Sequence, residues 1–145
     1  MSKTVIDIDI HRLPEEVFAY ITNFENNPKW QKGMKSCTFT SEGPVGVGTT
    51  YDQVASFFGK TIVTKFKVIE YEPNRMVKFV STESTFPLRI LRAVEPIDGG
   101  THVHAVIEGE PTGFFFKLLG PLLDRMVSSS INRDYARLKT LLEAS

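Results

Sequence analysis

Hydrophobic and polar residues alternate at the start of the chain. Ile6, Ile8 and Ile10 fall on one side of an extended chain, and Asp7 and Asp9 fall on the other. A period of two residues is typical of a half-buried β-strand. The first segment is therefore predicted to be a strand that turns its isoleucines toward a core.

Two short helices are predicted directly after this strand. Pro14 suits the first turn of a helix, and the two glutamates that follow it suit the positive N-terminal end. The next stretch, 23–30, contains turn-forming residues around Pro28 and is predicted to be a second short helix that presents Trp30.

Strand-like segments separated by turn signals follow from residue 35 onward, with the spacing of an antiparallel sheet. The predicted strands are 37–41, 49–57, 61–71, 76–82, 88–94 and 101–110. Between them, glycine, proline and asparagine mark turns at 43–46, 59–60, 73–74 and 98–100. The sheet is then complete.

The C-terminal segment, from about 114 to 144, has the spacing of an amphipathic helix. Its apolar residues recur every three or four positions, at Phe116, Leu119, Leu123, Val127, Ile131, Leu138 and Leu141 or Leu142. Gly120 and Pro121 predict a kink or a separate first turn. The order of elements predicts an α+β fold in which a curved antiparallel sheet wraps around this helix, and one helix does not fill such a concave face.

Composition and charge limit the number of domains and the classes of binding partner that are expected. A chain of 145 residues with 41% hydrophobic and 11% aromatic residues is expected to form one domain, 1–145, with a substantial core. Basic and acidic residues both total 17, so no net charge attracts nucleic acid.

The single Cys37 excludes an intramolecular disulfide framework, and the N-terminus lacks a secretory signal, which predicts a cytoplasmic location. The apolar stretch 113–127 carries charges and is too short for stable membrane insertion.

Several segments carry a resemblance to a known superfamily: IDIDIHRLPEEVFAYITNFENNPKW, EGPVGVGTTY, VIEYEPNRMVKF, GGTHVHAVIEG and the closing ARLKTLLEA. The chain resembles the START-like, birch-pollen-allergen-like helix-grip domains (SRPBCC), and within them the polyketide cyclase/dehydrase and lipid-transport group. The resemblance covers almost the whole chain. It implies a sheet of about six or seven strands that grips the C-terminal helix, with a cavity between them. It implies no particular reaction, because such families share the cavity while their ligands and chemistry diverge.

Strand parity and helix position predict a set of ligand-binding residues: Trp30, Tyr51, Gln53, Phe66, Phe79, Ser81, Phe86, Arg89, Leu119, Leu123 and Met126. Ordinary core packing is the competing interpretation for each aromatic ring among them. Tyr51 and Gln53 carry more weight, because their polar ends need partners when buried. A mostly apolar wall with a few polar atoms suits a hydrophobic ligand with one or two oxygens.

Arg89 and Arg92 lie on one predicted strand, an odd number of positions apart. Their side chains therefore point to opposite faces, and a regular strand turns only one of them inward. Arg89 is predicted to be that residue if either is, and the alternative places both at the surface or the rim. An inward arginine requires a carboxylate or an anionic ligand as its partner.

No metal site, cofactor or catalytic residue is assigned. His102 and His104 share a strand face, but Val103 and Ala105 form the apolar face, so the histidines are predicted to lie outside. Cys37 has no evident paired histidine, and no glycine-flanked serine occurs.

Three functions remain open. The leading one is binding or carrying a small hydrophobic molecule, such as a lipid, an isoprenoid or a polyketide. The second is a cyclase or dehydratase in which Tyr51, an arginine or Asp52 assists proton transfer, although Asp52 has outward parity. The third is a protein-interaction module that uses the cluster from Phe114 to Phe116. A homodimer is left open.

Overall fold

A computed structural model describes residues 2–57, 59–109 and 114–145, apart from the side chains of residues 2, 57 and 114–119. Within this part the elements are β1 (Ser2–Ile10), α1 (Pro14–Thr22), the 3₁₀ turn η1 (Phe24–Asn26), α2 (Asn27–Trp30), β2 (Met34–Phe39), β3 (Thr50–Phe57), β4 (Lys60–Glu72), β5 (Met76–Glu83), β6 (Leu88–Ile97), β7 (Gly100–Gly109) and α3 (Phe114–Glu143).

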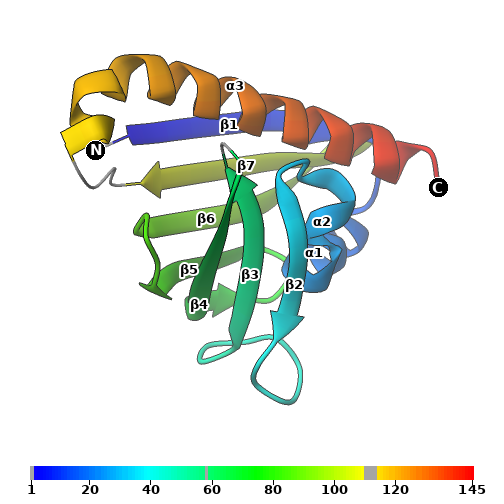
Figure 1. Cartoon of the computed structure of the whole chain (residues 1–145). Coiled ribbons are helices and arrows are strands. Elements are labelled where there is room, and N and C mark those ends of the chain that lie inside the picture. Colours follow the sequence, from blue (N-terminus) through cyan, green and yellow to red (C-terminus); the bar gives the residue numbers. More distant parts are fainter. Residues whose placement is uncertain (1, 58, 110–113) are drawn as a thin grey trace.

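The strands form a seven-stranded antiparallel sheet in the order β1-β7-β6-β5-β4-β3-β2. The sheet curls, α3 runs along β1 at one edge, and α1 and α2 lie at one end of the strands beside β2 (Figure 1). This arrangement confirms the predicted α+β fold, with a curved sheet around a long C-terminal helix and two short helices after the first strand. No helix in the described part of the chain is both long enough and apolar enough to cross a membrane.

The predicted strands are all present, with ends that differ by a few residues. The start of β1, the start of β2 and the end of β6 each differ from the prediction by three residues. Lys60 pairs with Phe57 and so belongs to β4, whereas the sequence placed it in a turn. The helix α3 continues through Pro121, so the proline does not create a separate first turn.

The hairpin between β6 and β7 shows why its glycines are needed. Ile97 pairs with Gly100, which leaves Asp98 and Gly99 as a two-residue turn. Gly99 has a φ of 81°, a left-handed conformation that glycine adopts without strain. A Cβ atom on Gly100 would lie 2.2 Å from the carbonyl oxygen of Ile10, so this close approach to β1 also excludes any larger residue.

Buried side chains on the inner face of the sheet form two neighbouring clusters. One lies between α1, α3 and strands β1, β6 and β7, and its members include Ile10, Phe18, Val103, Tyr135 and Leu138. The other is mainly aromatic, spans η1 and strands β2 to β5, and consists of Phe24, Cys37, Tyr51, Phe66, Val68, Val77 and Phe79. Both clusters adjoin the end of the sheet that α1 and α2 cover.

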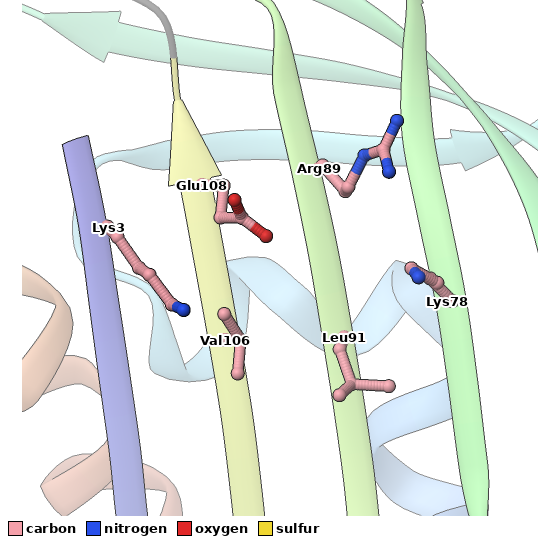
Figure 2. A pocket seen from close by; sticks show the side chains of 6 residues that line it. All are labelled: Lys3, Lys78, Arg89, Leu91, Val106 and Glu108. Atoms are coloured by element: carbon pink, nitrogen blue, oxygen red, sulfur yellow. The ribbon is translucent and has the colours of Figure 1, made fainter. Parts of the chain in front are cut away.

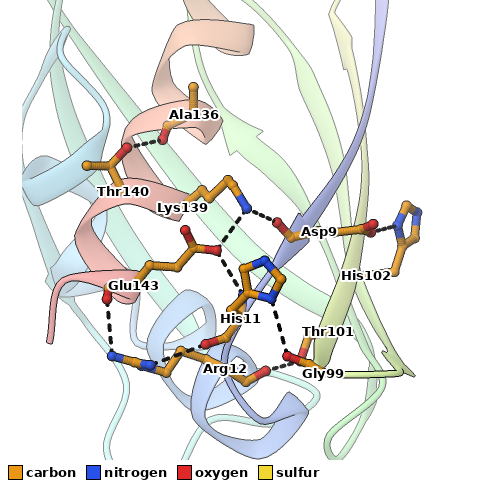
Figure 3. A network of polar contacts seen from close by, with 10 residues as sticks. All are labelled: Asp9, His11, Arg12, Gly99, Thr101, His102, Ala136, Lys139, Thr140 and Glu143. Carbon is orange, nitrogen blue, oxygen red and sulfur yellow. Dashed lines mark hydrogen bonds and ion pairs between the residues drawn. The ribbon is translucent and has the colours of Figure 1, made fainter.

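Polar contacts fasten the C-terminal end of α3 to the turn after β1 (Figure 3). The Lys139 ammonium donates to the Asp9 carbonyl at 2.5 Å and to the Glu143 carboxylate at 2.8 Å. The same carboxylate accepts the His11 backbone N–H at 2.9 Å. The helix is therefore held at its C-terminal end both by the buried cluster beneath it and by a charged network at its side.

Candidate functional site

The burial of inward-facing residues changes along the strands. Near α1 and α2, inner residues such as Tyr51, Phe79, Arg92 and Val103 are buried. Toward the other end of the same strands, Thr64 is buried, but most inner residues stay half-exposed: Gln53, Ala55, Ile62, Ser81, Leu88, Ile90 and Ile107. The concave face is thus tightly filled at one end, while a mostly apolar surface stays accessible at the other.

Stacked aromatic rings close the filled end. Tyr51 lies between Phe24 and Phe66, with ring centroids 4.3 Å and 5.0 Å away and nearly parallel planes. Phe79 meets Phe66 edge to face at 5.5 Å. Rings in these arrangements attract one another beyond the area they bury. They form an inner wall of packed rings behind the half-exposed surface.

A buried arginine adjoins this wall. Arg92, on β6, is 2% exposed, and its Nη1 donates to the Ile21 carbonyl at 2.8 Å and to Asn27 Oδ1 at 3.2 Å. Its guanidinium carbon lies 5.0 Å from the centre of the Trp30 ring and 5.2 Å from that of Phe79. Ile21 is in the last turn of α1, which has no basic residue of its own, so Arg92 places a positive charge at the negative end of that helix.

The prediction that Arg89 turns inward is wrong. The sheet register pairs Phe79 with Ile90 on the inner face and Val80 with Arg89 on the outer face, so the next inward residue after Ile90 is Arg92. Arg89 instead lines a hollow of about 230 Å³ on the outer face (Figure 2). The other residues that line this hollow are Lys3, Lys78, Leu91, Val106 and Glu108.

Burial keeps the titratable groups near Arg92 protonated. Burial raises the pKa of Tyr51 well above its usual value, an effect that the Arg92 charge partly opposes. Burial also raises the pKa of the Cys37 thiol to about 11, against a hydrogen bond from Asn27 that lowers it. At neutral pH both groups are uncharged. Neither is a thiolate or phenolate nucleophile or base under those conditions.

The structure brings most of the predicted ligand-binding residues to the inner side of the sheet. Trp30, Tyr51, Phe66 and Phe79 are buried at the closed end, and Leu123 is buried on α3. Gln53 and Ser81 lie on the half-exposed surface, and the Ser81 hydroxyl accepts the Leu88 backbone N–H at 2.9 Å. Phe86 is half-buried in the connection between β5 and β6. Their part in ligand binding remains a prediction.

Two further predicted residues differ from this group. Met126 is 47% exposed, because the side of α3 that meets the sheet carries Ile131, Tyr135 and Leu138, and Met126 falls on another side of the helix. Its inward placement was wrong. The Leu119 side chain and the cluster from Phe114 to Phe116 lie outside the described residues.

Sequence reasoning missed Arg92 and Asn27 as inner residues. The signal for Arg92 was present, because it shares parity with Leu88, Ile90 and Val94, all apolar. No local pattern marks Asn27, whose contact with Arg92 joins residues 65 positions apart.

The outer face holds the remaining candidate groups. Asp52 forms a 3.4 Å salt bridge with Lys65, in agreement with its outward parity. His102 contacts both Asp9 and Asp7, at 2.6 Å and 2.9 Å, and hydrogen bonds to these carboxylates raise its pKa. No set of three His, Cys, Asp or Glu residues suited to a metal ion is found within the described ranges.

Comparisons with known proteins match this architecture. A family model described as "Polyketide cyclase / dehydrase and lipid transport" matches residues 1–143. Protein TTHA0849 from Thermus thermophilus has a similar structure, with a TM-score of 0.85, 22% sequence identity and coverage of 99% of each chain. A START superfamily protein from Mycobacterium smegmatis is similar with a TM-score of 0.70 and 15% identity, over 99% of this chain and 96% of that one.

A third similar structure comes from a protein with two domains. The di-domain ARO/CYC protein BexL, from the BE-7585A biosynthetic pathway, has a TM-score of 0.74 and 19% identity, over 99% of this chain and 47% of that one. Among curated protein sequences, none matches this chain. At these identities the structural likeness shows the shared fold and does not transfer an activity.

Proposed function

Since the chain belongs to the polyketide cyclase/dehydrase and lipid transport family, we propose that it binds a small hydrophobic molecule on the concave face of its sheet, beneath α3. Lipids, isoprenoids and polyketides are the classes of molecule that suit such a surface. A cytoplasmic location belongs to the same proposal.

The half-exposed inner surface is the observation that supports this proposal. Leu88, Ile90 and Ile107 turn apolar side chains toward the inside of the curled sheet, yet each stays partly accessible. Contact of apolar surface with water is unfavourable, and an apolar ligand relieves it by covering the surface. Gln53 and Ser81 add polar atoms to the same half-exposed surface, and these atoms suit a ligand with an oxygen.

Binding without chemistry fits the inner groups better than proton transfer does. Among the described residues of the seven strands, the inner face carries no carboxylate. The buried phenol of Tyr51 and the guanidinium of Arg92 are hydrogen-bond donors at neutral pH. A cyclase or dehydratase reaction needs a general base within reach of the ligand. The described inner face supplies none.

Two adjacent residues of β6 provide a matched test. Ile90 faces inward and Leu91 faces outward, and both are half-exposed. We expect Ile90→Trp to fill the inner surface and abolish ligand binding, whereas Leu91→Trp leaves binding intact. Native mass spectrometry of the gently purified protein, followed by thermal shift with fatty acids, isoprenoid quinones and aromatic polyketides, measures both effects.

Three results would count against the proposal. One is a ligand-free protein that responds to no member of the panel. Another is equal binding by the two tryptophan variants, which would place the ligand elsewhere. The third is loss of binding in Leu91→Trp alone, which would move the site to the outer face.

A further inference from the structure

Three buried hydrogen-bond donors at the closed end of the concave face have no acceptor among the described residues. They are Arg92 Nε, Trp30 Nε1 and the Tyr51 hydroxyl. The three side chains are 1% to 2% exposed, so solvent at the protein surface does not reach them. Buried polar groups in folded proteins normally find a partner, and one without a partner points to a water molecule or a ligand.

The charge of Arg92 is also incompletely balanced. No carboxylate within the described ranges forms a salt bridge with it. The Ile21 carbonyl, Asn27 Oδ1, the neighbouring Tyr135 phenol and the π faces of Trp30, Phe24 and Phe79 supply partial negative charge only. A buried guanidinium is costly unless a negative charge accompanies it, and partial charges offset that cost incompletely.

The three donors lie next to the half-exposed surface. On β6, Arg92 is the next inward-facing residue after Ile90. On β3, Tyr51 is the inward-facing residue just before Gln53. One inward step along a strand is about 7 Å. A ligand that covers Ile90 and Gln53 therefore has its inner end close to Arg92 and Tyr51, where the Phe79 ring lies against the Arg92 guanidinium.

We infer that the ligand is an amphipathic acid, whose apolar body covers the half-exposed surface and whose anionic oxygen binds Arg92, with Tyr51 and Trp30 as further donors. This inference rests on the proposed function and adds the chemical class of the ligand. A carboxylate supplies both the missing negative charge and the missing acceptor, and a hydrogen bond between two charged groups is stronger than one between neutral groups. A neutral oxygen would leave the guanidinium without a counter-charge.

The test compares an acid with a neutral molecule of the same chain length. Decanoate and 1-decanol are titrated at pH 8 against the protein by displacement of a fluorescent hydrophobic dye. The wild-type protein is expected to bind decanoate about tenfold or more tightly than decanol. Arg92→Met, which keeps most of the side-chain volume, is expected to lose this preference and still bind decanol. Arg89→Met on the outer face is the matched control and is expected to keep the preference.

Two conservative variants test the inference even if the Arg92→Met protein does not fold. Tyr51→Phe and Trp30→Phe remove a donor and keep an aromatic ring, so each is expected to weaken decanoate binding severalfold and to weaken decanol binding by less. Circular dichroism checks the fold of every variant.

The outcomes separate this inference from the proposed function. Equal wild-type affinity for decanoate and decanol overturns the acidic ligand and leaves the hydrophobic site standing. A preference for decanoate that survives in Arg92→Met and disappears in Arg89→Met assigns the anion to the outer face and also overturns it. Failure of both compounds to bind counts against the proposed function itself.

Discussion

Arg92 connects three parts of the molecule through one side chain. It belongs to β6, donates to a carbonyl at the end of α1, and contacts Asn27 at the start of α2. It also lies against the rings of Phe24 in η1 and Trp30 in α2. A buried cation costs free energy unless polar groups surround it, and the contacts with α1 and α2 offset part of that cost.

The aromatic wall and the half-exposed surface make different contributions to stability at the level of single residues. Phe79 is fully buried, whereas Ile90, its partner across the strand pair, is only half-buried. Phe79→Ala is expected to lower the free energy of unfolding by roughly 3 to 5 kcal/mol, because a buried ring leaves a cavity. Ile90→Ala is expected to lower it by less than about 2 kcal/mol.

Urea denaturation of both variants measures these losses. Equal losses would show that Ile90 is packed as tightly as Phe79. The half-exposed surface would then not be available to a ligand, and the proposed function would lose its support.

At the level of elements, α3 depends on the network at its C-terminal end (Figure 3). Glu143 accepts from Lys139 and from the His11 backbone, and these hydrogen bonds lower its pKa below the ordinary value of 4.5. A carboxyl with a lowered folded pKa stabilises the fold above the unfolded pKa, and this contribution is lost as the pH falls through the folded pKa.

Glu143→Gln is therefore expected to lower the Tm at pH 7, with a difference from wild type that narrows as the pH drops below about 4.5. Thermal unfolding followed by circular dichroism between pH 3.5 and pH 7 measures this. Glu42→Gln, on an exposed position between β2 and β3, is the control and is expected to show little difference at any pH. A Glu143→Gln difference that stays constant across the range would mean that the carboxylate charge does not hold the helix.

At the scale of the whole molecule, the sheet is closed at one end and accessible at the other. A molecule built in this way is stabilised by any ligand that binds only the folded state. At a free ligand concentration about 100 times Kd, the gain is about 2.7 kcal/mol, which for a chain of this size corresponds to a rise in Tm of roughly 5 to 10 °C.

Differential scanning calorimetry with a bound panel member is expected to show this rise, increasing with the logarithm of the ligand concentration. The Ile90→Trp variant is expected to show no rise. A Tm that is independent of ligand concentration would mean that the compound does not bind the folded protein selectively.

The sequence by itself determined the elements and the direction in which most side chains point. Alternation along 5–10 and 61–71, turn signals at glycines and prolines, and the helical spacing after Phe114 are local properties, because strand and helix periods repeat within a few residues. For the same reason Tyr51, Phe66 and Phe79 were placed on the inner face correctly. The resemblance of the whole chain to a known superfamily added the way in which the elements assemble.

Only the tertiary structure decided which inward residues are buried and which polar groups meet. Arg92 shares its side of the strand with the apolar residues Leu88, Ile90 and Val94. Whether this side or that of Arg89 faces inward depends on how β5 pairs with β6 and on where α1 ends. The half-exposed state of Ile90 and the outward position of Met126 likewise depend on how far α1, α2 and α3 cover the sheet. These outcomes come from packing between segments distant in the chain, and local periodicity carries no information about such contacts.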